Sequence, residues 1–212
     1  MAYQHEHELF ENIKDFWGKY NNIIIYITLL ILGVMLFWKW WSHRTYSVVE
    51  NSSVIYNEVL SGYFSDDKKY FLANVNKLIE EGDNTLYADF ARLLLAKKLL
   101  EEKNSEEAKK HLLHIVHNSK QKNIADLANI RLAKIYVDEK SFTQALAAIA
   151  NISDNHLKFF AHEVRGDIYV EQKKISQARQ EYELAISKRQ DLVHDGDNIL
   201  LFKMATLTKS EQ

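Results

Sequence analysis

Proline and cysteine are both absent from the 212-residue sequence, and glycine occurs only six times. Average proline usage of about 5% would give on the order of ten prolines in a chain of this length. Because proline and glycine interrupt helices and form turns, their scarcity indicates long, uninterrupted helices. The absence of cysteine excludes disulfides, a cysteine nucleophile and zinc sites that need thiolates. We therefore expect an all-α fold.

The sequence also lacks an excess of charge of either sign. It has 27 Lys and Arg residues against 29 Asp and Glu residues, of which 24 and 25, respectively, follow Trp41. A domain with this balance has no basic field that would attract nucleic acid or anionic lipid. Nucleic-acid binding is therefore disfavoured.

One apolar stretch dominates the sequence, Tyr20 to Trp41, which reads YNNIIIYITLLILGVMLFWKWW. The 19 residues from Tyr20 to Trp38 carry no charge. At about 1.5 Å rise per residue, such a helix covers the roughly 30 Å hydrocarbon core of a bilayer. A buried core helix of a soluble protein is the alternative, but a soluble helix this long normally keeps a polar face. We predict one transmembrane helix at 20–41, marked by Tyr20, Ile23, Gly33, Trp38 and Trp41, with aromatic rings at both ends.

The sequence on either side of this span does not fix its orientation. Residues 1–19 have apolar residues at helical spacing and form a short amphipathic head, whose acidic residues argue against a cleavable signal peptide. The positive-inside rule compares Lys14 and Lys19 on one side with Lys39 and Arg44 on the other, which is a tie. Charge alone therefore leaves the topology open.

Three segments after the span align without gaps, beginning at Ala96, Ala133 and Gly166, which are 37 and then 33 residues apart. In each segment a small residue is followed by a large one three positions later, by an alanine twelve positions later, and by another large residue after four more. The small residue and the alanine would let two antiparallel helices approach closely, while the large residues fill the grooves between them. These packing positions are Ala96, Leu99, Ala108 and Leu112; Ala133, Tyr136, Ala145 and Ile149; and Gly166, Tyr169, Ala178 and Tyr182.

This pattern resembles the tetratricopeptide repeat, with a unit of about 34 residues. It lacks the early tryptophan and the closing proline of that repeat. We expect three such hairpins over 83–190, forming a solenoid. Residues 42–82 would be a helical stalk or a degenerate first hairpin whose register does not match convincingly, and residues 191–212 a C-terminal capping helix and tail.

Candidate chemical sites are few. His111, His114 and His117 lie three residues apart on one helix, but no Asp, Glu or Cys in that segment completes a metal shell. A polar helix face is the simpler explanation, and we expect neither a metal nor a cofactor nor catalysis. A metal-dependent enzyme that uses these histidines is kept as an alternative function. The expected function is binding at the face made by the first helices of the hairpins, where candidate residues are Arg92, Asn129, Arg131, His162 and Arg165.

The whole layout resembles the YfgM-like family of ancillary SecYEG translocon subunits. The residues that carry this resemblance are Ile13 to Trp17 before the span, Gly33 within it, Trp38 to His43 after it, and Phe202 to Met204 near the end. The resemblance implies an inner-membrane protein with a cytoplasmic N-terminus and a periplasmic repeat domain. It also implies a non-catalytic scaffold that contacts the SecYEG translocon, a membrane-anchored periplasmic chaperone and exported chains. The alternative is a membrane-tethered repeat adaptor for another envelope assembly or division complex.

Overall fold

The computed structural model describes residues 2–190 and 198–209, which belong to two compact units, residues 1–50 and 51–212. Every regular element in these described ranges is an α-helix, which confirms the predicted all-α fold. The first helix, α1 (Ala2–Phe64), contributes to both units, so each unit is described separately.

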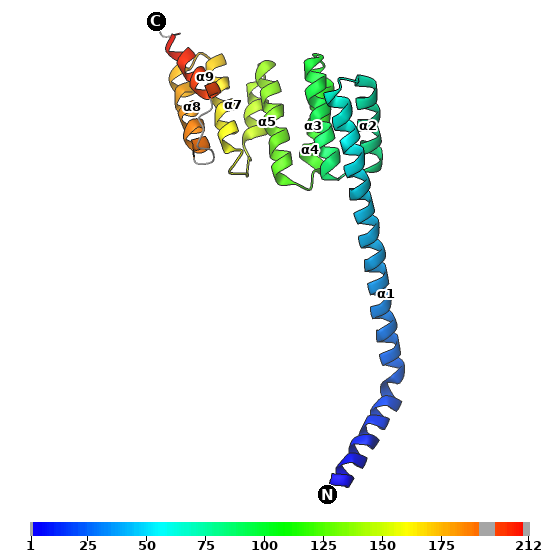
Figure 1. Ribbon diagram of the computed structural model, residues 1–212. Coiled ribbons are helices and arrows are strands. Elements are labelled where there is room, and N and C mark those ends of the chain that lie inside the picture. The colour runs from blue at the N-terminus through cyan, green and yellow to red at the C-terminus, as the bar shows by residue number, and fades with distance from the viewer. Residues whose placement is uncertain (1, 191–197, 210–212) are drawn as a thin grey trace. The chain divides into compact units, whose positions relative to one another are not determined.

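The first unit is the helical stretch that contains the predicted span, drawn in blue in Figure 1. All described side chains from Ile23 to Phe37 are exposed; Leu30 and Val34, for example, are 68% and 59% exposed. This segment is long and apolar enough to cross a membrane, and none of it is buried inside the protein. A continuous apolar surface of this kind is stable against lipid rather than water. A Cβ added to Gly33 would meet nothing within 4 Å, so the surface at this glycine is open to another helix.

The second unit is a stack of helical hairpins, which Figure 1 shows side by side in chain order from α2 to α9. Residues 51–64 of α1 pair with α2 (Lys68–Glu81). The following pairs are α3 (Leu86–Glu101) with α4 (Ser105–Asn118), α5 (Lys122–Asp138) with α6 (Phe142–Ile149), and α7 (Lys158–Glu171) with α8 (Ile175–Gln190), after which comes α9 (Asn198–Lys209). Residues 191–197, the first part of the predicted capping helix and tail, lie outside the described residues.

The core of this unit is divided into clusters that link successive hairpins. Phe71 and Leu78 of α2 pack with Leu95 of α3, and Leu112 of α4 packs with Leu132 of α5. Further clusters join α5 and α6 to α7, and α8 to α9. Each hairpin therefore buries its apolar face against the first helix of the next, as expected for a solenoid.

Three of the turns within hairpins have the same geometry. Lys103, Lys140 and Lys173 each follow a first helix and adopt the left-handed conformation, with φ of 62°, 58° and 62°. In each turn the backbone N–H of the next residue donates to the carbonyl five positions earlier, at 2.8–2.9 Å. This is the Schellman arrangement, in which glycine is the usual left-handed residue.

The first hairpin follows the same pattern with a shorter turn. Gly62 lies 34 residues before Ala96, and the left-handed residue Asp66 comes four positions after Gly62 rather than seven. Phe71 then follows Asp66 by five positions, which is where the other hairpins have their alanine. A Cβ on Gly62 would lie 2.7 Å from the Phe71 backbone nitrogen. A glycine opposite a phenylalanine thus replaces the usual pair of small residues.

Candidate partner-binding surface

The predicted packing residues occupy the interior of the hairpins. Nine of the twelve are buried, while Leu99, Tyr136 and Tyr169 are partly buried against the same clusters. In the hairpin of α7 and α8, a Cβ added to Gly166 would collide with the ring of Tyr182. These positions hold the helices in place and leave other residues to form the surface.

A partly buried polar network joins α7 to the C-terminal helix. Lys203 of α9 donates to Glu163 at 2.9 Å and to Asp167 at 2.7 Å, and the Tyr182 hydroxyl donates to Asp167 at 2.7 Å. Burial alone raises the pKa of Glu163, but the hydrogen bond from Lys203 and the nearby positive charges of Lys134 and Lys203 outweigh it and lower this pKa below its ordinary value. Lys203, together with Lys134, whose Nζ lies 3.4 Å from Glu163, therefore balances the charge of the two carboxylates of α7.

The five predicted partner-binding residues do not form one surface. Arg92 is only 7% exposed, and its guanidinium lies between Asp83, at 3.2 Å, and His111, at 3.5 Å. His162 contacts Glu181 of α8 at 2.7 Å, and Arg165 lies 3.7 Å from the same carboxylate. Arg92 and His162 are thus held by contacts within the domain, and Arg165 faces the second helix of its own hairpin.

Asn129 and Arg131 lie on different sides of α5. Asn129 lines a shallow depression together with Ala147 and Ala148 of α6. Arg131 points toward α3, where its Nη1 donates to the carbonyl oxygen of Leu93 at 3.0 Å. Of the five predicted residues, only Arg131 lines the groove between the first helices of two hairpins.

That groove has a volume of about 560 Å³ and lies between α3 and α5, beside α4. Its floor is apolar and its rim is mostly basic. The apolar residues are Ala96, Leu100, Leu112 and Ile135; the cations are Lys97, Lys103, Arg131 and Lys134; and the carboxylates are Asp138 and Glu139. Glu139 already accepts from Lys109 at 2.9 Å, and Lys134 is paired with Glu163 at 3.4 Å. The other three cations face Asp138 alone, so positive charge is in excess along the rim.

Two of the rim cations belong to a row of residues that sequence reasoning missed. This inner row consists of Tyr63, Lys97, Lys134 and Asp167, each directly after the small residue of its hairpin. Lys97 Nζ lies 5.6 Å from the centre of the Tyr63 ring, and a hydrogen bond with Tyr63 raises the pKa of Lys97. The repeat alignment contained the signal, because a residue next to a buried small one on a helix faces a different side.

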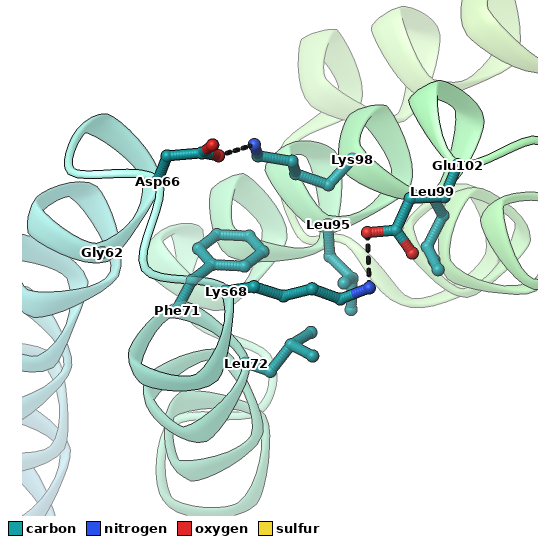
Figure 2. A pocket seen from close by; sticks show the side chains of 9 residues that line it. All are labelled: Gly62, Asp66, Lys68, Phe71, Leu72, Leu95, Lys98, Leu99 and Glu102. Atoms are coloured by element: carbon teal, nitrogen blue, oxygen red, sulfur yellow. Dashed lines mark hydrogen bonds and ion pairs between the residues drawn. The ribbon is translucent and has the colours of Figure 1, made fainter.

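Figure 2 shows a second cavity, of about 350 Å³, between the first two hairpins. Two ion pairs join its walls: Lys98 Nζ lies 2.6 Å from Asp66 Oδ1, and Lys68 Nζ lies 2.6 Å from Glu102 Oε1. The apolar side chains between them come from Phe71, Leu72, Leu95 and Leu99. Because its charged residues are paired with one another, this cavity offers less charge to a partner than the groove does.

Two of the three histidines of α4, His111 and His114, are also held by contacts within the domain. Burial is the main cause that lowers the pKa of His111, and the charge of Arg92 adds to it. His114 Nε2 lies 3.4 Å from Asp83, whereas His117 is exposed. Within the described part of the chain, no three His, Cys, Asp or Glu residues are grouped so that they could hold a metal ion.

The sequence model of the tetratricopeptide repeat-like domain family matches residues 14–209. The chain belongs to this family. Members of the repeat class bury their small and large residues between stacked hairpins, as this domain does. No solved structure matches the chain.

The chain is also a distant homologue of ancillary SecYEG translocon subunits, which confirms the resemblance noted in the sequence. One from Neisseria gonorrhoeae is 26% identical over 97% of this chain and 99% of its own length. The protein of that name from Escherichia coli is 22% identical over 87% of this chain and 88% of its own. One from Buchnera aphidicola of Schizaphis graminum is 27% identical over 72% and 78%, respectively. These homologues and the exposed apolar helix together indicate membrane anchoring.

Proposed function

We propose that this protein is a non-catalytic, membrane-anchored scaffold at the Sec translocon. The observation that carries the proposal is the similarity to ancillary SecYEG translocon subunits over nearly the whole length of both chains, span and repeats included. The apolar helix at 20–41 would associate laterally with the channel, where Gly33 leaves room for a neighbouring helix. The hairpin domain would bind partners through its exposed faces.

In this proposal the N-terminus is cytoplasmic and the repeat domain is periplasmic, next to a membrane-anchored chaperone and newly exported chains. The absence of cysteine makes this topology easy to test. Single variants Lys14→Cys and Lys188→Cys place a thiol at exposed positions before and after the span. A maleimide that cannot cross the membrane should label only Lys188→Cys in intact spheroplasts. Labelling of Lys14→Cys alone would reverse the topology.

The partners are tested by photocrosslinking in living cells. A benzophenone amino acid replaces Leu30 or Val34 in the span and Leu100 in the groove, and the captured proteins are identified. Lys188 on α8, which is exposed but lies outside the groove, is the matched control position. We expect SecYEG subunits from the span, and an envelope chaperone or exported chains from Leu100. Reproducible capture of an unrelated envelope or division complex, without a channel subunit, would favour a general adaptor instead.

A further inference from the structure

We propose that the groove between α3 and α5 binds an extended acidic segment of an exported chain, in which a large apolar side chain stands between carboxylates. This inference rests on the proposed function for the source of the segment. The chemistry of the segment is argued from the groove itself.

The groove carries an excess of positive charge. Four cations line the groove, and only two carboxylates do, one of which is already bound by Lys109. Lys134 Nζ lies 3.4 Å from Glu163 Oε1, which leaves Lys97, Lys103 and Arg131 against Asp138, so positive charge remains in excess. Lys97 and Lys134 are exposed, so both can reach a ligand without unfolding of the domain. The whole domain is close to neutral, and the positive charge here is therefore a local property of this groove. A ligand with carboxylates would complement it, and a basic ligand would be repelled.

The floor of the groove is apolar. Leu100 lines the groove and is 37% exposed, so its side chain is accessible to an apolar group of a ligand. Leu112 and Ile135 continue this surface toward the interior. A volume of about 560 Å³ matches the size of typical ligand pockets, which accommodate a few side chains and not a folded domain. One large apolar side chain of the ligand would therefore enter the groove.

The residues of the inner row change in charge along the stack of hairpins. Tyr63 and Lys97 lie toward the first hairpin, and Lys134 follows on the next first helix, with its Nζ 5.5 Å from the centre of the Phe160 ring. Beyond it, Asp167 is bound to Lys203. Acidic residues on both sides of the apolar one would then meet Lys97 at one end and Arg131 or Lys134 at the other.

The test uses the full-length protein in detergent micelles and three fluorescent peptides of about nine residues, roughly 30 Å when extended. All three contain the same leucines and one phenylalanine. The other positions are Asp and Glu in the acidic peptide, Asn and Gln in the neutral peptide, and Lys in the basic peptide. Fluorescence anisotropy should show that the acidic peptide binds most tightly and the basic one most weakly. Binding of the acidic peptide should weaken between about 0.05 M and about 0.5 M salt, where screening shortens the Debye length from about 14 Å to about 4 Å.

The decisive variant is the double reversal Lys97→Glu with Lys134→Glu. We expect it to raise the dissociation constant of the acidic peptide at least about tenfold. The matched control is Lys77→Glu with Lys188→Glu, which makes the same charge change at exposed positions of α2 and α8 outside the groove, and should change the constant less than about twofold. Leu100→Ala should weaken the acidic and the neutral peptide by similar factors. Circular dichroism of each variant verifies that the helices remain folded.

Equal binding of the acidic and basic peptides, or equal effects of the two double reversals, would overturn the proposal. Crosslinking from Leu100 must also capture exported chains; capture of a chaperone alone would exclude the proposed source of the segment. These failures are distinct from failure of the proposed function, because loss of channel capture from Leu30 would leave the peptide measurements unchanged.

Discussion

Replacing the left-handed lysines of the hairpin turns by glycine should stabilise the protein. Lys140 and Lys173 both adopt φ near +60°, where the Cβ of an L-residue approaches the following carbonyl oxygen. Neither residue lines the groove, so partner binding is not altered by the change. The backbone hydrogen bonds of the two turns involve the N–H of each lysine and of its successor, and glycine preserves them.

The expected magnitude follows from two opposing terms. A non-glycine residue in the left-handed region is destabilised by about 1–2 kcal/mol. Glycine loses more backbone entropy on folding, which offsets about 0.5–1 kcal/mol of the stabilisation gained by relieving this strain. The net stabilisation is therefore about 0.5–1 kcal/mol for each site. The two turns lie in different hairpins, so their effects should add, and the melting temperature should rise by about 2–8 °C for a domain of this size.

The assay is thermal and urea unfolding of the purified full-length protein, followed by circular dichroism at 222 nm. Lys140→Ala is the matched control, because it removes the same charge but keeps a Cβ in the left-handed conformation. It should change the stability by no more than a few tenths of a kcal/mol. If Lys140→Ala stabilised the protein as much as Lys140→Gly, the side chain and not the backbone conformation would be responsible, and the reasoning would be refuted.

Three other changes test the interior. Asp126 is 0% exposed and accepts from three donors of the loop between α6 and α7 and from a lysine. Replacing Asp126 by Asn should lower the free energy of unfolding in urea by about 2–3 kcal/mol, because the amide cannot accept all of these bonds. The pKa of Asp126 is lowered despite burial, so this contribution is present above pH about 4 and the difference from Asn should shrink as acid protonates the folded carboxyl. Burial and the hydrogen bond to Asp167 raise the pKa of Tyr182. The stability that the protonated Tyr182 contributes is therefore fully present below pH about 10 and declines above it. In melting scans, the Tyr182→Phe variant should lose less stability above that pH than the unchanged protein does. Gly62→Ala should destabilise the first hairpin by about 1–3 kcal/mol, because the Cβ of the alanine would press against the Phe71 backbone. The destabilisation should appear as faster hydrogen exchange in this hairpin, and unchanged exchange would show that the helices can separate freely.

The helical fold and the three regular hairpins could be predicted because their signals are local. Missing prolines, an uncharged run of 19 residues and a repeated spacing of small and large residues need no long-range contact to be recognised. The first hairpin escaped the alignment because its turn is three residues shorter and its small pair is redistributed as Gly62 and Phe71. A gapless alignment cannot detect a hairpin in which a smaller residue on the first helix, Gly62, accommodates a larger one on the second, Phe71.

The partner surface was harder to predict, and the reason is geometric. Arg92 and His162 occupy the position where the repeat usually has a tryptophan, which is a packing position, and the structure accordingly binds them to Asp83 and Glu181. A basic residue at that position therefore indicates pairing with a carboxylate of the same domain and not a partner-binding site. Only the relative rotation of successive hairpins decides which residues line a groove, and it is set by contacts between hairpins that the sequence pattern does not contain.

The inner row shows how such a domain can vary its binding without changing its fold. Gly62, Ala96, Ala133 and Gly166 are constrained by close helix contacts, whereas the residue after each of them, on another side of the helix, is not. Tyr63, Lys97, Lys134 and Asp167 can therefore differ in charge while the hairpins keep the same packing. At the last position, Asp167 would end the basic groove with a negative charge, but Lys203 of α9 neutralises it. The C-terminal helix thus has two effects, since it covers the apolar end of the stack and also determines the charge that a ligand meets there.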